Sequence, residues 1–183
     1  MRIITVSGAR SNVGKTSLVS LLAARLPGYG AIKVTITDLF TSVTDDPVTI
    51  SEEGKDTAVM KGAGADPVVW VRCPVEALSE SLSYALNLAA GGKGVIIEGN
   101  SPVGLIEPDV AFFVTGADPR DMKPGAAEVL ARADVVVVNV DDDSPSDSAE
   151  QAVREHNKAA VITTMRRMRA PDEDILAFFS KMD

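Results

Sequence analysis

Ala9-Arg10-Ser11-Asn12-Val13-Gly14-Lys15-Thr16 follows the apolar run Ile3-Ile4-Thr5-Val6 and precedes the apolar-periodic segment Leu18–Leu22. An apolar strand, a glycine-containing loop and a helix, in this order, are the context in which a phosphate-binding P-loop forms. One position departs from the pattern: Ala9 stands where the first glycine is expected, and Gly8 lies one residue earlier. The sequence therefore predicts a loop that binds a nucleoside triphosphate.

The residue types in this loop suit the chemistry of phosphate. Backbone N–H groups at the turn, together with the positive end of the following helix, favour an anion. Gly14 allows the backbone to pass close to the phosphates, Lys15 can reach the β- and γ-phosphates, and the Thr16 hydroxyl is placed to bind Mg²⁺. The nucleotide-binding residues expected here are Ala9, Arg10, Ser11, Asn12, Val13, Gly14, Lys15, Thr16 and Ser17.

Composition limits the class of protein. A chain of 183 residues with 45% hydrophobic content suits one globular domain over residues 1–183. The net charge of −8 argues against general nucleic-acid binding, which needs basic surface. No apolar stretch approaches the ~20 residues that span a bilayer, so no membrane partner is expected. The single cysteine, Cys73, and the absence of a secretory pattern favour the cytoplasm.

Strand-like runs alternate with helical patterns along the chain. Several of the runs are continuously apolar, as in strands buried on both faces of a parallel sheet. We therefore predict a single-domain α/β fold, a mostly parallel sheet of about seven strands with helices on both faces, as in P-loop NTPases. The expected strands are Ile3–Val6, Ala31–Ile36, Val68–Arg72, Gly94–Ile97, Val110–Val114, Val135–Val138 and Ala159–Thr163; the expected helices are Lys15–Leu26, Glu53–Ala63, Val75–Ala90, Ala126–Ala133, Asp147–Asn157 and Asp172–Lys181. Residues 38–52 show no periodicity, and so long a connection usually marks a functional or mobile segment.

Ligands of such folds bind outside the carboxyl ends of the strands, where two acids stand out. Glu98 ends the buried strand Gly94–Ile97, as the carboxylate of a Walker B element does, and is expected to bind Mg²⁺ directly or through water. Asp38 follows the strand Ala31–Ile36 and is either a second Mg²⁺ carboxylate or a turn-forming residue.

Two further residues are candidates for the chemistry. Lys33 lies within the apolar strand Ala31–Ile36, where a lysine is costly unless it is paired or faces an anion; it contacts phosphate or substrate, or sits at an exposed edge. Asp56 opens the helix Glu53–Ala63, where helix capping alone could explain it. Its neighbour Lys55 is a cation at the start of a helix, where the helix dipole disfavours positive charge. An anionic ligand or a carboxylate partner nearby would offset this cost.

Base recognition rests on a weaker pattern. Asn139 and Asp142 follow a strand at the spacing of the Asn-Lys-x-Asp run that reads guanine in P-loop GTPases, but Val140 replaces the lysine. A plain acidic loop explains them equally well. Three arginines after the last strand are interpreted as a solvated basic loop: Arg166, Arg167 and Arg169.

These motifs resemble those of small P-loop proteins grouped with dethiobiotin synthetase, cobyrinic acid amide synthases and the molybdopterin-guanine dinucleotide biosynthesis protein B. Residues 8–16 resemble the Gly-x-x-x-x-Val-Gly-Lys-Thr of dethiobiotin synthetase, and Glu98-Gly99 resembles the Glu-Gly near the magnesium in both branches. Gly54-Lys55-Asp56-Thr57, followed by Gly64-Ala65, is similar to the Gly-Lys-Asp-Ser…Gly-Ala of the molybdopterin protein. The resemblance covers most of residues 1–165 and implies a homodimer. Where the wider class often has an early second lysine this chain has Arg10, which could supply the same charge.

Two functions remain open. The first is a GTP-binding accessory protein of cofactor biosynthesis with slow hydrolysis and a client protein, carried by Lys15, Thr16, Glu98 and Asp56. The second is an ATP-dependent ligase that phosphorylates a small carboxylate or carbamate held by Lys33 and residues 100–104. A ligase needs a substrate cavity beside the γ-phosphate, whereas a switch needs a mobile segment such as residues 38–52. Both use Mg²⁺ with GTP or ATP.

Overall fold

The computed structural model describes residues 1–140 and 147–166. The chain forms two compact units. The first comprises residues 1–6 and 16–109, and the second comprises residues 7–15 together with the chain from Val110 onward. The single domain expected over residues 1–183 stays a prediction.

The first unit is built on five strands, which lie side by side in the order β3-β4-β2-β5-β1. They are β1 (Arg2–Gly8), β2 (Tyr29–Ile36), β3 (Ser42–Thr44), β4 (Val68–Cys73) and β5 (Gly94–Glu98). All neighbouring pairs are parallel except β3 with β4. The register places Lys33 of β2 opposite Trp70 of β4 and also opposite Glu98 of β5. Residues paired in this way project from the same face of a sheet, so these three side chains share one face.

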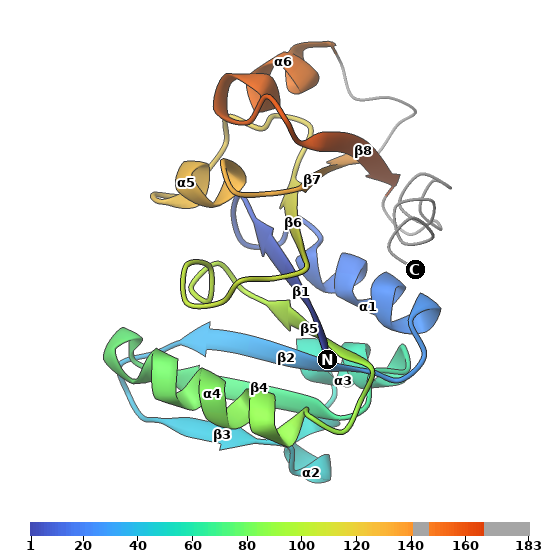
Figure 1. Cartoon of the computed structure of the whole chain (residues 1–183), viewed down its shortest axis with the longest axis vertical. Helices are drawn as coiled ribbons and strands as arrows, with labels where there is room; N and C mark the ends of the chain where they lie inside the picture. The colour runs from blue at the N-terminus through green and yellow to red at the C-terminus, as the bar shows by residue number, and fades with distance from the viewer. Residues whose placement is uncertain (141–146, 167–183) are drawn as a thin grey trace. The chain divides into compact units, whose positions relative to one another are not determined.

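Helices lie on both faces of this unit's sheet. Figure 1 shows α4 (Leu78–Leu88) on the viewer's side of β2 and β4, and α3 (Asp56–Gly62) on the far side. The remaining elements are α1 (Lys15–Arg25), α2 (Pro47–Ile50) and the 3₁₀ turn η1 (Val75–Ala77). Leu78, Leu82 and Ala85 of α4 pack into one apolar cluster with Val69, Val71 and Ile97 of the strands. The apolar side of α4 is therefore a packing surface.

The second unit carries three parallel strands with two helices. The strands are β6 (Val110–Thr115), β7 (Val135–Val140) and β8 (Val161–Arg166), and the helices are α5 (Ala126–Leu130) and α6 (Asp147–His156). The four consecutive valines 135–138 are almost wholly buried, as expected of a strand covered on both faces.

The predicted α/β fold with mostly parallel strands is confirmed, and the residues that the structure describes contain eight strands. The additional strand, β3, lies within residues 38–52, which showed no periodicity. Three residues are too short for an alternating pattern to stand out. The same segment holds α2, whose N-cap Asp46 accepts a hydrogen bond from the Thr49 N–H at 2.9 Å. The helix expected at Asp172–Lys181 falls outside the described residues.

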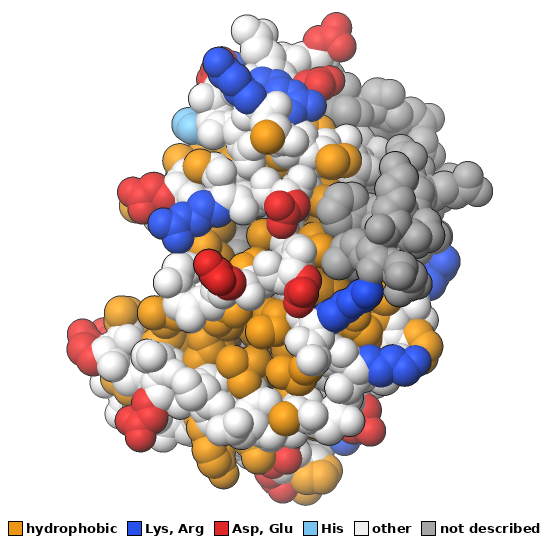
Figure 2. All heavy atoms as spheres, viewed as in Figure 1, with side chains coloured by type: hydrophobic (Ala, Val, Ile, Leu, Met, Phe, Trp, Pro, Cys, Tyr) orange, Lys and Arg blue, Asp and Glu red, His pale blue; other side chains and the backbone are white. Residues whose placement is uncertain are grey.

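Some apolar surface is exposed on the first unit. Figure 2 shows hydrophobic side chains gathered beside α4 on the face turned to the viewer. Large apolar side chains exposed in this unit include Val75, Tyr84 and Leu105. Surfaces of this kind often serve in protein contacts, and the expected homodimer stays a prediction. No helix within the described residues is long and apolar enough to cross a membrane.

Candidate functional site

The start of the P-loop is held by backbone hydrogen bonds within the second unit. The N–H of Ala9 donates to the carbonyl of Val114 at 2.9 Å, and the Ala9 carbonyl accepts from the N–H of Lys123 at 2.9 Å. A Cβ at Gly8 would lie 2.9 Å from Cγ2 of Val13 and 3.0 Å from the Val114 carbonyl oxygen. Gly8 therefore provides the close backbone approach expected of the motif's first glycine, and an alanine is tolerated at position 9.

The end of the loop is shaped by Gly14 and Asn139. Gly14 has a φ of +105°, and a Cβ there would collide with Nδ2 of Asn139. That same Nδ2 donates a hydrogen bond to the Val13 carbonyl at 2.8 Å. Asn139 thus supports the P-loop directly. Its Oδ1 is buried and has no hydrogen-bond partner within the described part of the chain.

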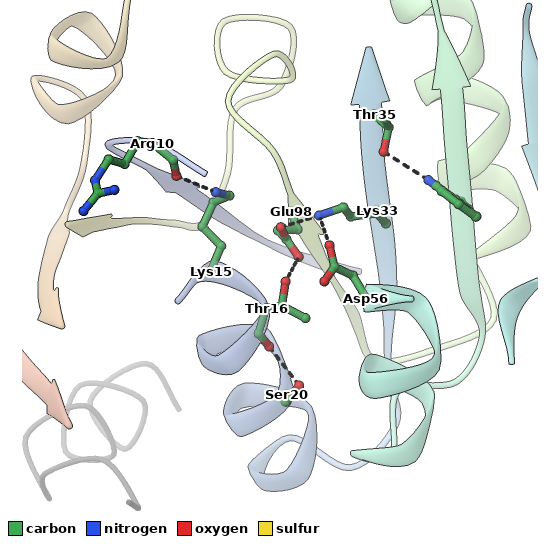
Figure 3. Close-up of polar contacts among 9 residues, drawn as sticks. Arg10, Lys15, Thr16, Ser20, Lys33, Thr35, Asp56 and Glu98 are labelled. Atoms are coloured by element: carbon green, nitrogen blue, oxygen red, sulfur yellow. Dashed lines mark hydrogen bonds and ion pairs between the residues drawn. The ribbon is translucent and has the colours of Figure 1, made fainter. Parts of the chain in front are cut away.

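Lys15 and Arg10 both belong to this loop. Nζ of Lys15 donates to the carbonyl of Arg10 at 3.0 Å, so the ammonium folds back over the loop (Figure 3). Nε of Arg10 lies 2.8 Å from Oδ2 of Asp121, and both side chains are more than half exposed. An exposed pair of this kind is worth about 0–1 kcal/mol, so little holds Arg10 in place. The expectation that Arg10 supplies the charge of the second lysine stays a prediction.

Four side chains of the first unit form a continuous polar chain, drawn in Figure 3. Oγ1 of Thr16 donates to Oε2 of Glu98 at 3.0 Å. The other carboxylate oxygen, Oε1, lies 2.6 Å from Nζ of Lys33. The same Nζ lies 2.6 Å from Oδ2 of Asp56. Lys33 therefore joins a strand-end carboxylate to a helix-start carboxylate, and Asp56 has a role besides capping.

The charges of Glu98, Lys33 and Asp56 depend on one another. Glu98 is 1% exposed, and an ionised carboxylate at such a site is costly without a partner. Burial lowers the pKa of Lys33, but the charges of Glu98 and Asp56 and the hydrogen bonds to both outweigh burial and raise the pKa overall. The ammonium of Lys33 therefore stays protonated across the physiological range. The Lys33 side chain is 16% exposed and paired with both carboxylates, and its contact with phosphate or substrate stays a prediction.

The donor set fits Mg²⁺. A hydroxyl and a carboxylate 3.0 Å apart, at the end of β5 and the start of α1, are hard oxygen ligands. Within the described residues no group of three or more His, Cys, Asp or Glu side chains is placed to hold a metal. Mg²⁺ is usually bound by one or two protein carboxylates and completes its shell with water and phosphate oxygens. Asp38 is exposed after β2, and its assignment as a metal ligand stays a prediction.

Each unit contains one cavity beside these residues. In the first unit a cavity of about 170 Å³ lies among Lys33, Lys55, Asp56, Thr57 and Trp70. In the second unit a cavity of about 220 Å³ is lined by the loop residues Arg10, Asn12 and Val13 and by Asn139. Sequence reasoning missed Thr57 and Trp70, because neither ends a strand. Asp142, Arg167 and Arg169 lie outside the described residues.

Comparison with known proteins defines the class of fold. No protein-family model matches the chain, and no curated protein matches its sequence. Among solved structures, it is similar to the hydrogenase maturation factor HypB from Archaeoglobus fulgidus, with 15% identity over 100% of this chain and 90% of that one, at a TM-score of 0.64. It is also similar to HypB from Helicobacter pylori in complex with nickel, with 15% identity over 98% of this chain and 84% of that one, at a TM-score of 0.62.

A third similar structure is the signal recognition particle receptor FtsY from Elizabethkingia anophelis in complex with GDP, with 15% identity over 92% of this chain and 58% of that one, at a TM-score of 0.52. These neighbours are P-loop NTPases. The chain therefore has the fold of the P-loop NTPases, in which the expected phosphate loop occupies its usual place between a first strand and a first helix.

Proposed function

We propose that this chain binds a nucleoside triphosphate together with Mg²⁺ and hydrolyses it slowly. The observation that carries the proposal is the 3.0 Å hydrogen bond between Thr16 and the buried Glu98. Thr16 directly follows Lys15 of the phosphate loop. A hydroxyl and a carboxylate held together beside such a loop have little structural purpose of their own. They suit a metal that accompanies phosphate.

Each residue then has a defined task. The backbone of residues 9–15 cradles the phosphates, and Lys15 exchanges the Arg10 carbonyl for a phosphate oxygen. Thr16 and Glu98 hold the cation, which when bound neutralises charge on the phosphates. Lys33 holds the other oxygen of the Glu98 carboxylate and so fixes its orientation. Catalysis of this kind depends on positioning and electrostatics, so fixed charges matter more than a nucleophilic side chain.

GTP is the nucleotide we favour, in an accessory role in cofactor biosynthesis like that of the molybdopterin-guanine dinucleotide protein B. Support comes from Asn139, which lines the cavity beside the loop and whose Oδ1 is buried without a partner in the described chain. A carbonyl oxygen in that state can accept a hydrogen bond from a nucleotide. Asp142 would complete the guanine pattern, and the similarity of Gly54-Lys55-Asp56-Thr57 to the molybdopterin protein supports the accessory role.

A second candidate is an ATP-dependent ligase of the dethiobiotin synthetase type. It is favoured by the cavity beside Lys33, because a ligase needs room for a second substrate near the transferred phosphate. The segment 38–52 also contains β3, which pairs with β4, and α2, so part of the expected switch segment is regular structure.

Competition binding tests the proposal and separates the candidates. Labelled GTP is displaced from the full chain by unlabelled GTP or ATP in the presence of Mg²⁺. We expect GTP to compete at lower concentration, and a clear preference for ATP would remove the assignment of Asn139 and Asp142 to guanine. Lys15→Ala should abolish binding while the circular dichroism spectrum stays unchanged. Unchanged nucleotide affinity in this variant would contradict the P-loop assignment itself.

A further inference from the structure

The cavity beside Lys33 contains a buried polar atom that the fold leaves without a partner. Thr57 is 1% exposed, lines the cavity, and its Oγ1 makes no hydrogen bond within the described chain. Leaving a buried hydroxyl unpaired is unfavourable, so such a group calls for an explanation. A ligand in the cavity would supply the missing partner.

The walls of the cavity are fixed before any ligand binds. Nε1 of Trp70 donates to Oγ1 of Thr35 at 3.1 Å, a bond drawn in Figure 3. The guanidinium of Arg72 lies 4.3 Å from the centroid of the Trp70 ring. These two contacts hold a flat aromatic wall in one position. Preorganisation of this kind reduces the entropy that binding would cost.

The polar groups around the cavity are mostly donors. An ammonium has three N–H donors, and Lys33 uses Glu98 and Asp56 as its partners. The Lys55 side chain is 42% exposed, and its Nζ lies 3.5 Å from Oε1 of Glu52. With the Thr57 hydroxyl, three side chains can donate toward one small acceptor. Of the charged residues that line the cavity, two are lysines and one is Asp56.

We propose that this cavity binds a small molecule that carries one carboxylate and an apolar part. The carboxylate accepts from Lys33, Lys55 and Thr57, and the apolar part lies against Trp70. A volume of about 170 Å³ is well below the ~300–1,000 Å³ of sites for larger ligands, so it excludes a nucleotide. A phosphate dianion is disfavoured because Asp56 belongs to the same lining.

Ligand binding in this cavity can be measured without nucleotide. Trp70 is the single tryptophan of the chain, so its fluorescence reports on the cavity. The full chain is titrated with acetate, butyrate and benzoate, with benzyl alcohol as an uncharged match for benzoate, and with inorganic phosphate. We expect at least one carboxylate to give a saturable change, with benzyl alcohol and phosphate at least about tenfold weaker.

Thr57→Val is the decisive variant, because it keeps the shape of the side chain and removes only the hydroxyl. It should weaken carboxylate binding about tenfold without lowering stability, since that hydroxyl has no partner in the fold. Thr115→Val is the matched control: Thr115 is also buried with an unpartnered hydroxyl, but it lies in β6 of the other unit. It should leave carboxylate binding unchanged.

Three results would overturn the proposal: no saturable change with any of the three carboxylates, equal or tighter binding of benzyl alcohol or phosphate, or unchanged affinity in Thr57→Val. GTP binding is measured separately by equilibrium dialysis. Loss of the carboxylate signal with normal GTP binding rejects this cavity alone. A normal carboxylate signal without GTP binding rejects the nucleotide proposal and keeps the cavity as a carboxylate site.

Discussion

Lys33 and Glu98 face each other across neighbouring strands, and the lysine ammonium lies 2.6 Å from the carboxylate that also accepts a hydrogen bond from Thr16. One carboxylate oxygen is thus committed to a fixed positive charge, while the other points to the start of α1. Such an arrangement places a cation directly beside Glu98, whose side chain is 1% exposed. It prepares an anionic ligand for Mg²⁺ before the metal arrives.

Removing the positive charge of Lys33 should destabilise the first unit. Lys33→Met leaves Glu98 as a buried carboxylate without its cation, and breaking a buried pair in this way costs about 3–5 kcal/mol. Urea unfolding followed by circular dichroism measures the change. The double variant Lys33→Met with Glu98→Gln should recover most of the loss, because no buried charge is left unpaired. Equal stability of the single and double variants would contradict this account of the pair.

Neutralising Glu98 should separate turnover from binding. Glu98→Gln keeps a side chain that can still accept from Lys33 but loses the charge that would hold Mg²⁺. We expect Mg²⁺-dependent hydrolysis to fall about tenfold or more, while the affinity for the nucleotide changes less, because residues 9–15 still hold the phosphates. Turnover at the original rate would mean that Glu98 is only structural. Ser83→Ala on α4 serves as a surface control.

The sequence predicts the phosphate loop better than it predicts the side-chain contacts made between neighbouring strands. The P-loop, Glu98 and the alternation of strands and helices were predictable because their patterns are local in the chain. The ion pairs of Lys33 with Glu98 and Asp56 were not predictable, because they depend on β2 lying beside β5, and no local pattern encodes that order of strands. Trp70 was missed for the same reason: its neighbour Lys33 is set by the register of β2 with β4.

Asn157, which follows α6, should be important for the stability of the second unit. Its Nδ2 donates to the carbonyls of Leu130 at 2.9 Å and Ala133 at 2.8 Å, and its Oδ1 accepts from the N–H groups of Ala159 and Ala160 at 3.2 and 3.0 Å. Asn157→Ala leaves all four backbone groups without this partner in a largely buried site, so we expect a loss of about 3 kcal/mol or more in urea unfolding. A change below about 1 kcal/mol would show that water replaces the side chain.

The same substitution at Asn139 should act on ligand binding. Asn139→Ala removes the hydrogen bond to the Val13 carbonyl and the Oδ1 that lines the cavity, so the loop loses a support on its nucleotide side. We expect GTP affinity to fall about tenfold in equilibrium dialysis. Asn157→Ala is the matched control, because it loses stability but should bind GTP normally under conditions where it is folded. Equal losses of affinity in both variants would point to general loosening of the unit.

The Mg²⁺-bound nucleotide and the carboxylate should bind cooperatively, because Lys33 contacts the proposed Mg²⁺ ligand Glu98 and also lines the carboxylate cavity. When Mg²⁺ engages Glu98, the lysine has less of that carboxylate's charge to balance and more to offer a ligand in the cavity. We expect saturating GTP with Mg²⁺ to raise the affinity for the bound carboxylate about fivefold or more, read from Trp70 fluorescence. Linkage requires the carboxylate to raise GTP affinity by the same factor, which equilibrium dialysis measures independently. Glu98→Gln should abolish the coupling and retain carboxylate binding. Coupling that persists in this variant would mean that the two sites communicate by a route other than the Lys33–Glu98 pair.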